Sequence, residues 1–291
     1  MTGLVLGGAA AVRSPAGPGF TEDPVALGYF DDLLAPFGDE PDVELLRRGA
    51  HVGHHELADL LAGSETVRDS RPQLLIVTHA LPDVVPFTAV APHLTARLGG
   101  EATSFAIVQQ GLAAPFTALR IAAAYGKAGR AAEVVIAVLE QTTLPTRFPL
   151  VQDTPLIDSA AALVLGAAGA APQDGGPPGF RLGRVSPGTT SPDDALRRAA
   201  DEDGTLLVLG SWVTGDAPYG PDVHRAAPGT YCTGVWLELA EHWREWQRDY
   251  HRIVLCDTDP LSGLSHLAEF AQDAPGHGGP ARGAFAQAGA R

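Results

Sequence analysis

Residues 105–129 read FAIVQQGLAAPFTALRIAAAYGKAG. An apolar strand pattern at 103–108 runs into a Gln-Gln-Gly turn and then into an Ala-rich helical pattern at 112–128. A residue at such a turn lies at a helix N-terminus, where unpaired N–H groups and the helix dipole favour negative charge. This environment suits a cysteine thiolate nucleophile, yet the position carries Leu112. The sequence therefore predicts the scaffold of a nucleophile elbow at 108–113 without its nucleophile.

Strand and helix patterns alternate around this elbow. Strands are predicted at 3–8, 73–78, 103–108, 133–139 and 160–165, and helices at 24–36, 42–48, 54–62, 84–98 and 112–128. Such alternation predicts an α/β fold with a mainly parallel sheet that is covered on both faces.

The pattern restarts after a Gly/Pro/Ala-rich segment at 167–179, which is typical of a linker. The second series consists of strands at 180–186, 205–210, 252–256 and 264–270 and helices at 192–202 and 232–248. We expect an N-terminal half at 1–166, a shortened second half at 180–271 and a disordered tail at 272–291.

The elbow resembles that of the ketoacyl synthase III branch of the thiolase superfamily, in which an F-x-V-x-Q-G strand leads to Cys and an A-L-x-x-A helix. Residues 73–83 resemble the family's D-x-x-I-x-x-T-x-x-P-D strand and turn, 133–140 its strand ending in an acidic residue, and 158–165 its D-G-A-A-A strand. The resemblance implies a thiolase-like fold of five layers, built from two similar βαβαβαββ-type halves. The Gly/Pro-rich stretch from Ser211 to Gly229 stands where the family has another helix and strand, and we interpret it as a deletion.

Condensation in this family needs Cys, His and Asn, which accept the acyl group and stabilise a developing enolate. The resemblance places Leu112 at the Cys position, Ser211 at the His position and Thr230 at the Asn position. None of the three can perform the corresponding role. We therefore expect no catalytic residue at these three positions and no acyl condensation by this chain alone.

The expected pocket lies at the elbow, with Gln110 and Gly111 beside Leu112. In the family a Gly-rich turn shapes the oxyanion site, but here Asp257 and Pro260 replace much of that turn. A proline ring and a carboxylate are poor substitutes where backbone N–H groups must face an oxyanion.

Cysteine and histidine offer alternatives outside these positions. Cys232 is predicted at a helix start with His224 eight residues upstream, so a relocated Cys–His pair is one interpretation and a small buried cysteine is the favoured one. His51 and His55 have the spacing of one helix face, but no third ligand is identifiable and we expect no metal site. The aromatic stripe from Trp236 to Tyr250 is interpreted as core rather than as a partner surface.

The resemblance also implies an obligate dimer, in which the strand before the elbow pairs with its copy. It places Thr103, Phe105, Ile107 and His79 at this interface. A chain that has lost the catalytic residues can still supply half of such a sheet. We expect a non-catalytic subunit whose partner is a catalytically intact ketoacyl synthase III-like chain, or a second copy of itself, acting on an acyl thioester of coenzyme A or acyl carrier protein.

Two other hypotheses stay open: an acyltransferase of altered mechanism that needs no Cys nucleophile, and a homodimeric binding or scaffold protein. The formal net charge of −14 argues against nucleic acid as a partner. The absence of a long apolar run predicts no membrane span, and two cysteines without a leader sequence favour a cytoplasmic protein with reduced thiols. No cofactor is expected.

Overall fold

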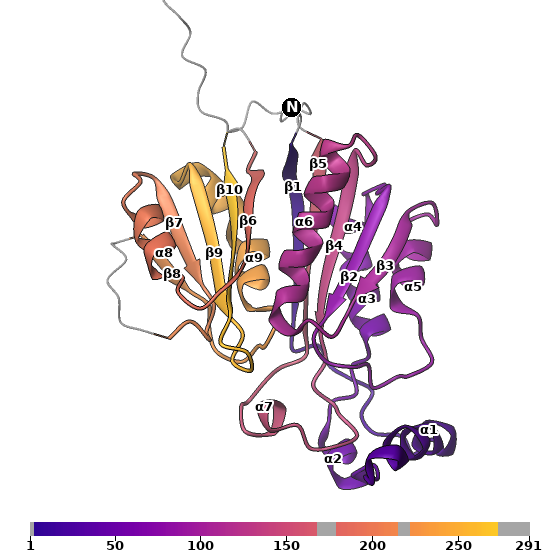
Figure 1. The fold of residues 1–291 in the computed structure, drawn as a ribbon. Coiled ribbons are helices and arrows are strands. Elements are labelled where there is room, and N and C mark those ends of the chain that lie inside the picture. Colours follow the sequence, from indigo (N-terminus) through magenta and orange to yellow (C-terminus); the bar gives the residue numbers. More distant parts are fainter. Residues whose placement is uncertain (1–2, 168–178, 215–221, 273–291) are drawn as a thin grey trace, which may run out of the picture.

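The computed structural model describes residues 3–167, 179–214 and 222–272, and within these ranges ten strands form one sheet (Figure 1). The strands are β1 (Leu4–Arg13), β2 (Leu74–His79), β3 (Thr103–Ile107), β4 (Glu133–Glu140), β5 (Ser159–Ala167), β6 (Arg181–Thr189), β7 (Thr205–Leu209), β8 (Val223–Arg225), β9 (Arg252–Thr258) and β10 (Ser265–Ala271). The helices are α1 (Pro24–Leu34), α2 (Val43–Arg48), α3 (His54–Gly63), α4 (Glu65–Arg68), α5 (Val90–Arg97), α6 (Ala114–Lys127), α7 (Pro149–Gln152), α8 (Asp193–Ala200) and α9 (Gly234–Asp249), with 3-10 turns η1 (Ala35–Phe37) and η2 (Gly111–Ala113).

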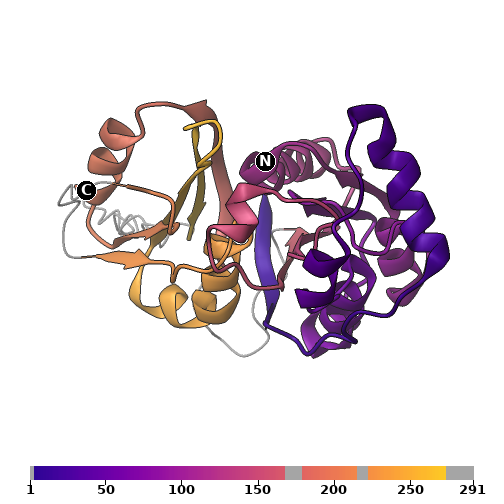
Figure 2. The ribbon, with the colours of Figure 1, turned by 90° about the horizontal axis from the view of Figure 1, so that it is seen from below.

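The strand order shows that the two halves share one topology. The order is β3-β2-β4-β5-β1 in the first half and, continuing, β6-β10-β9-β7-β8 in the second. Adding five to each number of the first half gives the second half in reverse, and the parallel and antiparallel pairings correspond as well. The halves meet where Val5 of β1 pairs with Arg181 of β6, and Figure 2 shows them side by side.

Alternate residues of the central strands pack on opposite faces of the sheet. In β2, Leu74 and Ile76 belong to the core shared by both halves, whereas Leu75 and Val77 pack under the outer helices. Leu206 and Leu207 of β7 divide in the same way between the shared core and a smaller cluster under α8. Burial on both faces explains why these strands read as continuous apolar runs.

The helices complete five layers. The outer layer of the first half consists of α3, α4 and α5, while within the described residues the second half has only α8 in this position. Between the halves lie α6, which contacts β1 to β4 as well as β6 and β10, and α9, which contacts β1, β5, β7 and β9 (Figure 1). The expected five-layered α/β arrangement of two similar halves is therefore present, and within the described residues the second half has the smaller outer layer. No helix in the described ranges combines the length and apolarity required to cross a bilayer.

Several elements differ from the sequence-based expectation. The sheet is mixed rather than mainly parallel, because β4–β5 and β9–β10 are antiparallel neighbours. The first strand continues to Arg13, and the helix expected from residue 84 begins only at Val90; Pro86 disfavours a helical conformation of the residue before it and so opposes a start at 84. Of the linker expected at 167–179 and the tail expected at 272–291, residues 168–178 and 273–291 lie outside the described residues.

The interpretation of 211–229 as a complete deletion is wrong in one respect. Val223–Arg225 form β8, which pairs in parallel with β7 as β3 pairs with β2. The strand is retained at three residues, and its sequence is too short to carry a periodic signal.

A buried carboxylate joins the two halves. Glu140 ends β4, and its carboxylate accepts hydrogen bonds from the backbone N–H groups of Tyr231 (2.6 Å), Cys232 (2.6 Å) and Thr233 (3.1 Å) at the N-terminus of α9. The side chain is 1% exposed. It satisfies N–H groups that have no partner inside the helix, where the helix dipole also favours negative charge.

We expect Glu140→Ala to reduce the free energy of unfolding by about 3 kcal/mol, because several buried N–H groups lose their acceptor together. Urea denaturation followed by circular dichroism measures the loss. Glu101→Ala, at an exposed carboxylate, is the control and should change stability by less than about 0.5 kcal/mol. Equal stability of the two variants would contradict the role of Glu140.

Candidate functional site

The turn between β3 and α6 has the strained backbone of an elbow. Gln109 has a φ of 59°, in the left-handed region that non-glycine residues rarely adopt, and Gly111 has a φ of 51°. Residues 111–113 then form η2, and α6 follows from Ala114. The strand-turn-helix geometry predicted from residues 105–129 is therefore present.

The side chain at the elbow is part of the hydrophobic core. Leu112 is 1% exposed and belongs to the cluster that holds Phe116, Tyr231 and Trp236. It points away from solvent and does not line the neighbouring cavity. A hydrocarbon in this place contributes packing and offers no group that could react.

Tyr231 and Asp259 face the elbow from the second half. A β-carbon on Gly111 would lie 2.6 Å from both the Tyr231 hydroxyl and an Asp259 carboxylate oxygen, so only glycine fits there. The Tyr231 hydroxyl lies 3.3 Å from each Asp259 carboxylate oxygen, to which it donates. Burial first, and then the charge of Asp259, raises the pKa of Tyr231, while a backbone hydrogen bond from Leu112 opposes the rise. These two side chains occupy the space in which a side chain of Gly111 would lie.

The turn between β9 and β10 uses its backbone N–H groups internally. The Asp259 carboxylate accepts from Leu261 N (2.8 Å) and Ser262 N (3.4 Å), and Gly263 N donates to the Asp259 carbonyl (2.7 Å). These groups are therefore engaged within the turn instead of facing a bound oxyanion. Pro260 lies in the same turn and does not line the cavity.

A cavity of about 460 Å³ opens beside the elbow. It lies between the elbow, the first turns of α6, β6 and the β9–β10 turn. Its lining residues are Gln109, Gln110, Gly111, Ala113, Phe116, Thr117, Arg120, Ser186, Pro187, Gly188, Tyr231, Asp259, Leu261, Ser262, Leu264 and His266.

The polar groups of this cavity come from both halves. On α6, Thr117 donates to the Gln110 amide oxygen (2.8 Å) and accepts from Arg120 (3.2 Å). On β10, His266 is 8% exposed; burial lowers its pKa, although Asp259 acts in the opposite direction. A neutral imidazole is therefore available in the cavity as a proton acceptor.

Tyr231, Asp259, Arg120 and His266 were not singled out from the sequence. Tyr231 and Asp259 are direct neighbours of Thr230 and Pro260, which the resemblance did mark. His266 and Arg120 gave no local signal, because only the packing of β10 against α6 brings them to the elbow.

Asp257 is a buried carboxylic acid in β9, two residues before Asp259. Asp257 packs on Gly210, where a β-carbon would lie 2.0 Å from its carboxyl carbon, and it accepts from Thr258 N (2.9 Å). Burial raises the pKa of Asp257 well above its usual value; the Thr258 N–H opposes this, and the charges of Glu140 and Asp259 add to it. Asp257 therefore packs beside the site and does not line the cavity.

The remaining resemblance-derived positions are separated from the cavity. Thr230 is 2% exposed, and its hydroxyl has no hydrogen-bond partner. Its carbonyl accepts from the Trp212 indole N–H (2.8 Å), and Ser211 follows the end of β7 half-buried. Neither residue lines the elbow cavity.

The structure does not bring Cys232 and His224 together. Cys232 is 1% exposed, and its Sγ contacts the Leu139 carbonyl at 3.6 Å. Burial raises the pKa of Cys232 well above that of a free thiol, and Glu140 raises it further, which is the opposite of thiolate activation. His224 Nε2 instead donates to Glu238 at 2.6 Å.

Of the other histidines, His51 and His55 lie in the insertion between β1 and β2, and His79 ends β2. Nε2 of His51 donates to the Leu46 carbonyl (2.6 Å), and His55 packs its ring near His93, so the two do not converge on a metal. His79 donates from Nδ1 to the Leu81 carbonyl (2.8 Å) and packs against His54; burial lowers the pKa of both rings.

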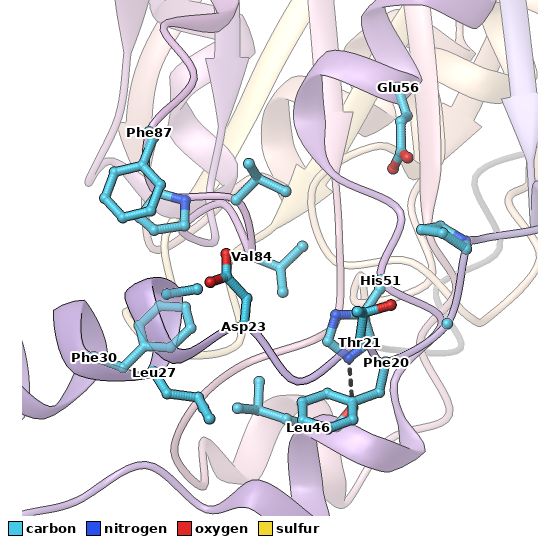
Figure 3. Close-up of a pocket in the computed structure, with 15 residues that line it drawn as sticks. Phe20, Thr21, Asp23, Leu27, Phe30, Leu46, His51, Glu56, Val84 and Phe87 are labelled. Carbon is cyan, nitrogen blue, oxygen red and sulfur yellow. Dashed lines mark hydrogen bonds between the residues drawn. The ribbon is translucent and has the colours of Figure 1, made fainter.

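A second cavity, of about 220 Å³, lies beside His51 between α1, α2 and residues 84–87 (Figure 3). Phe30, Leu27 and Phe87 lie on one side of it, and Phe20 and Leu46 on the other. Asp23 caps α1, and Glu56 accepts from Gly53 N, so the acids of this cavity have structural partners. The elbow cavity therefore remains the stronger candidate for a functional site.

We expect Asp257→Asn to become more stable relative to the parent chain as the pH rises. The folded chain retains the Asp257 proton to a higher pH than the unfolded chain, so ionisation above the usual value of 3.8 costs stability. Urea unfolding at about pH 4 and about pH 8 should show a shift of at least about 1 kcal/mol. Asp39→Asn, at an exposed position, should show none. A pH-independent difference for Asp257→Asn would contradict this prediction.

Both thiols should resist iodoacetamide in the folded chain, because Cys232 and Cys256 are buried and burial raises the pKa of each. Intact-mass measurement should find no adduct before unfolding and two afterwards. Rapid modification of Cys232 in the folded chain would restore it as a candidate nucleophile.

No family model matches the sequence, and none of the curated proteins matches it significantly. Solved structures do match the fold. The 3-oxoacyl-(acyl carrier protein) synthase III FabH of Pseudomonas aeruginosa PAO1 is 18% identical with a TM-score of 0.57, over 93% of this chain and 98% of that one. OleA of Xanthomonas campestris, a cysteine-to-serine variant with bound lauric acid and lauroyl-CoA, is 14% identical with a TM-score of 0.57, over 92% and 99%. FabH of Xanthomonas oryzae pv. oryzae is 14% identical with a TM-score of 0.56, over 93% and 100%. The chain thus has the thiolase-like fold of the ketoacyl synthase III-like proteins FabH and OleA.

Proposed function

We propose that this chain is a non-catalytic, ketoacyl synthase III-like subunit that pairs with a catalytically intact chain. The complex would be a condensing enzyme or acyltransferase of polyketide or fatty-acyl-derived natural-product biosynthesis. The observation that carries the proposal is the elbow itself. Its backbone is retained, while Leu112 is buried in the core and Tyr231 and Asp259 fill the space above it.

The chemistry of the described residues supports a loss of acyl condensation. Neither cysteine is poised as a thiolate, because burial raises the pKa of both. The turn that would face an oxyanion binds the Asp259 carboxylate instead. A fold that keeps its central geometry while its reactive positions serve packing is typical of a subunit retained for assembly.

The edge of the sheet supports pairing with a second chain. β3 is the end strand of the described sheet, and its Thr103 and Ala106 side chains are exposed. Val108, just beyond the strand, is 41% exposed. An open edge strand is a template for pairing with another strand, so a partner that covers β3 would complete the sheet. We assign Phe105 and Ile107 to this interface on the face of β3 that packs against the core. We assign His79 to it at the end of the adjoining strand, β2.

An acyl thioester is the substrate class that we propose for the complex. The OleA structure that matches this fold holds lauric acid and lauroyl-CoA in that protein. In this chain the elbow cavity has room for part of such a ligand. Because the net charge of this chain is −14, we expect an acidic carrier protein to dock on the partner instead.

Co-expression with a catalytically intact ketoacyl synthase III-like protein of the same organism tests the pairing. We expect the two chains to co-purify as a 1:1 complex and the complex to transfer acyl groups. Ala106→Asp should abolish co-purification, because it places a charge on the edge strand at the proposed interface. Ala96→Asp, at an exposed position on α5, is the matched control and should leave the complex intact.

Two results would overturn the proposal. Condensation of acyl units by the purified chain alone would remove its non-catalytic character. A stable homodimer that ignores every intact homologue would favour the binding or scaffold protein instead. If Ala106→Asp and Ala96→Asp co-purified equally well with the partner, β3 would not be part of the interface.

His266 favours a second candidate, an active acyltransferase of altered mechanism. Its imidazole lines the elbow cavity, and burial lowers its pKa, so it could accept a proton from an attacking amine or alcohol. Incubating the chain alone with an acyl thioester and an amine would reveal product in that case, and His266→Asn would abolish it. Absence of product with an otherwise folded chain supports the non-catalytic assignment.

A further inference from the structure

Three potential metal ligands converge outside the elbow cavity, on the second half of the fold. His224 comes from β8, and Glu238 and His242 lie one turn apart on α9. One ligand atom of each lies within 4.8 Å of the other two. His224 Nε2 is 2.6 Å and His242 Nε2 is 3.8 Å from the same oxygen, Glu238 Oε2.

The carboxylate of this group is held in place by hydrogen bonds. His224 Nε2 donates to Oε2 of Glu238 at 2.6 Å. Arg13 binds the other oxygen, Oε1, at 2.8 Å and is itself fixed by Glu241 at 2.7 Å. Oε2 is therefore left to the two imidazoles, and the guanidinium orients the carboxylate through its hydrogen bond to Oε1, as the partners of ligating groups do in metal sites.

The two imidazoles combine a fixed setting with access to solvent. Trp246 packs against both rings, with centroid distances of 5.1 Å to His224 and 5.3 Å to His242. The side chains of His224 and His242 are 32% and 38% exposed, whereas Glu238 is 8% exposed. An ion from solvent can reach the nitrogens directly, and the indole restricts the rings to a few orientations.

We propose that His224, Glu238 and His242 form a binding site for one divalent transition-metal ion, with Zn²⁺ the best fit. Two imidazoles and one carboxylate are a recognised zinc ligand set that leaves a fourth position open. Ligand atoms around tetrahedral zinc are separated by roughly 3.4 Å, so the observed separations need only small side-chain rotations. The site is independent of the elbow and of the proposed pairing through β3.

The metal would join β8 to α9. β8 is the end strand opposite β3 in the described sheet and is held to β7 over three residues. A metal that binds His224 together with two residues of α9 fixes this short strand to the central helix, so binding should raise the thermal stability of the folded chain.

Titration of the metal-free full-length chain with Zn²⁺ and Co²⁺ tests the proposal. Calorimetry should give one Zn²⁺ per chain, bound Co²⁺ should show the visible absorption of a four- or five-coordinate ion, and Co²⁺ should quench fluorescence through Trp246. His224→Gln and His242→Gln should each weaken binding by at least about tenfold and remove the thermal stabilisation. His93→Gln is the matched control, because His93 contacts Asp59 at 3.0 Å in a histidine–acid pair on the other half.

Binding that is unchanged in His224→Gln would overturn the proposal, since it would reduce the site to adventitious binding by exposed groups of α9. Absence of Zn²⁺ binding at micromolar concentrations would overturn it as well. Circular dichroism of each metal-free variant verifies folding. Should His242→Gln fail to fold, His224→Gln decides the outcome, because it alters only the three-residue edge strand.

Discussion

The Glu140 carboxylate at the start of α9 is the interaction on which the arrangement of the two halves depends. It ends a strand of the first half and accepts three backbone N–H groups of the second. This contact fixes Tyr231, and Tyr231 with Asp259 then closes the space above the elbow. The burial of a carboxylate is tolerated because a helix N-terminus supplies both the donors and a favourable dipole.

The elbow combines a strand-turn-helix backbone with a central side chain that serves packing. Gln109 has a left-handed backbone conformation that is costly for a residue other than glycine, whereas Gly111 adopts its positive φ without a steric penalty. Leu112 belongs to the core, and the neighbouring turn directs its N–H groups to Asp259. The elbow still offers a helix N-terminus and an adjoining cavity of about 460 Å³.

Much of the fold could be predicted from the sequence because it depends on local periodicity. The runs Leu74–Val77 in β2 and Val134–Leu139 in β4 are apolar at every position, since both faces are buried, and the Gln-Gln-Gly turn before an Ala-rich helix predicted the elbow. β8 was missed because three residues carry no period. Asp259 and His266 were missed at the candidate site, and so was the convergence of His224 on Glu238, because each depends on residues distant in the chain.

The sequence by itself determined the elements, the duplicated α/β plan and the absence of a thiol at residue 112, since these depend on residue identity and short-range pattern. Only the tertiary structure decided which side chains share a space. It buried Cys232 away from His224, filled the elbow with Tyr231 and Asp259, and assembled a histidine–carboxylate cluster from β8 and α9. The physical reason is that packing and desolvation act between residues separated by tens to hundreds of positions, and no local pattern encodes such distances.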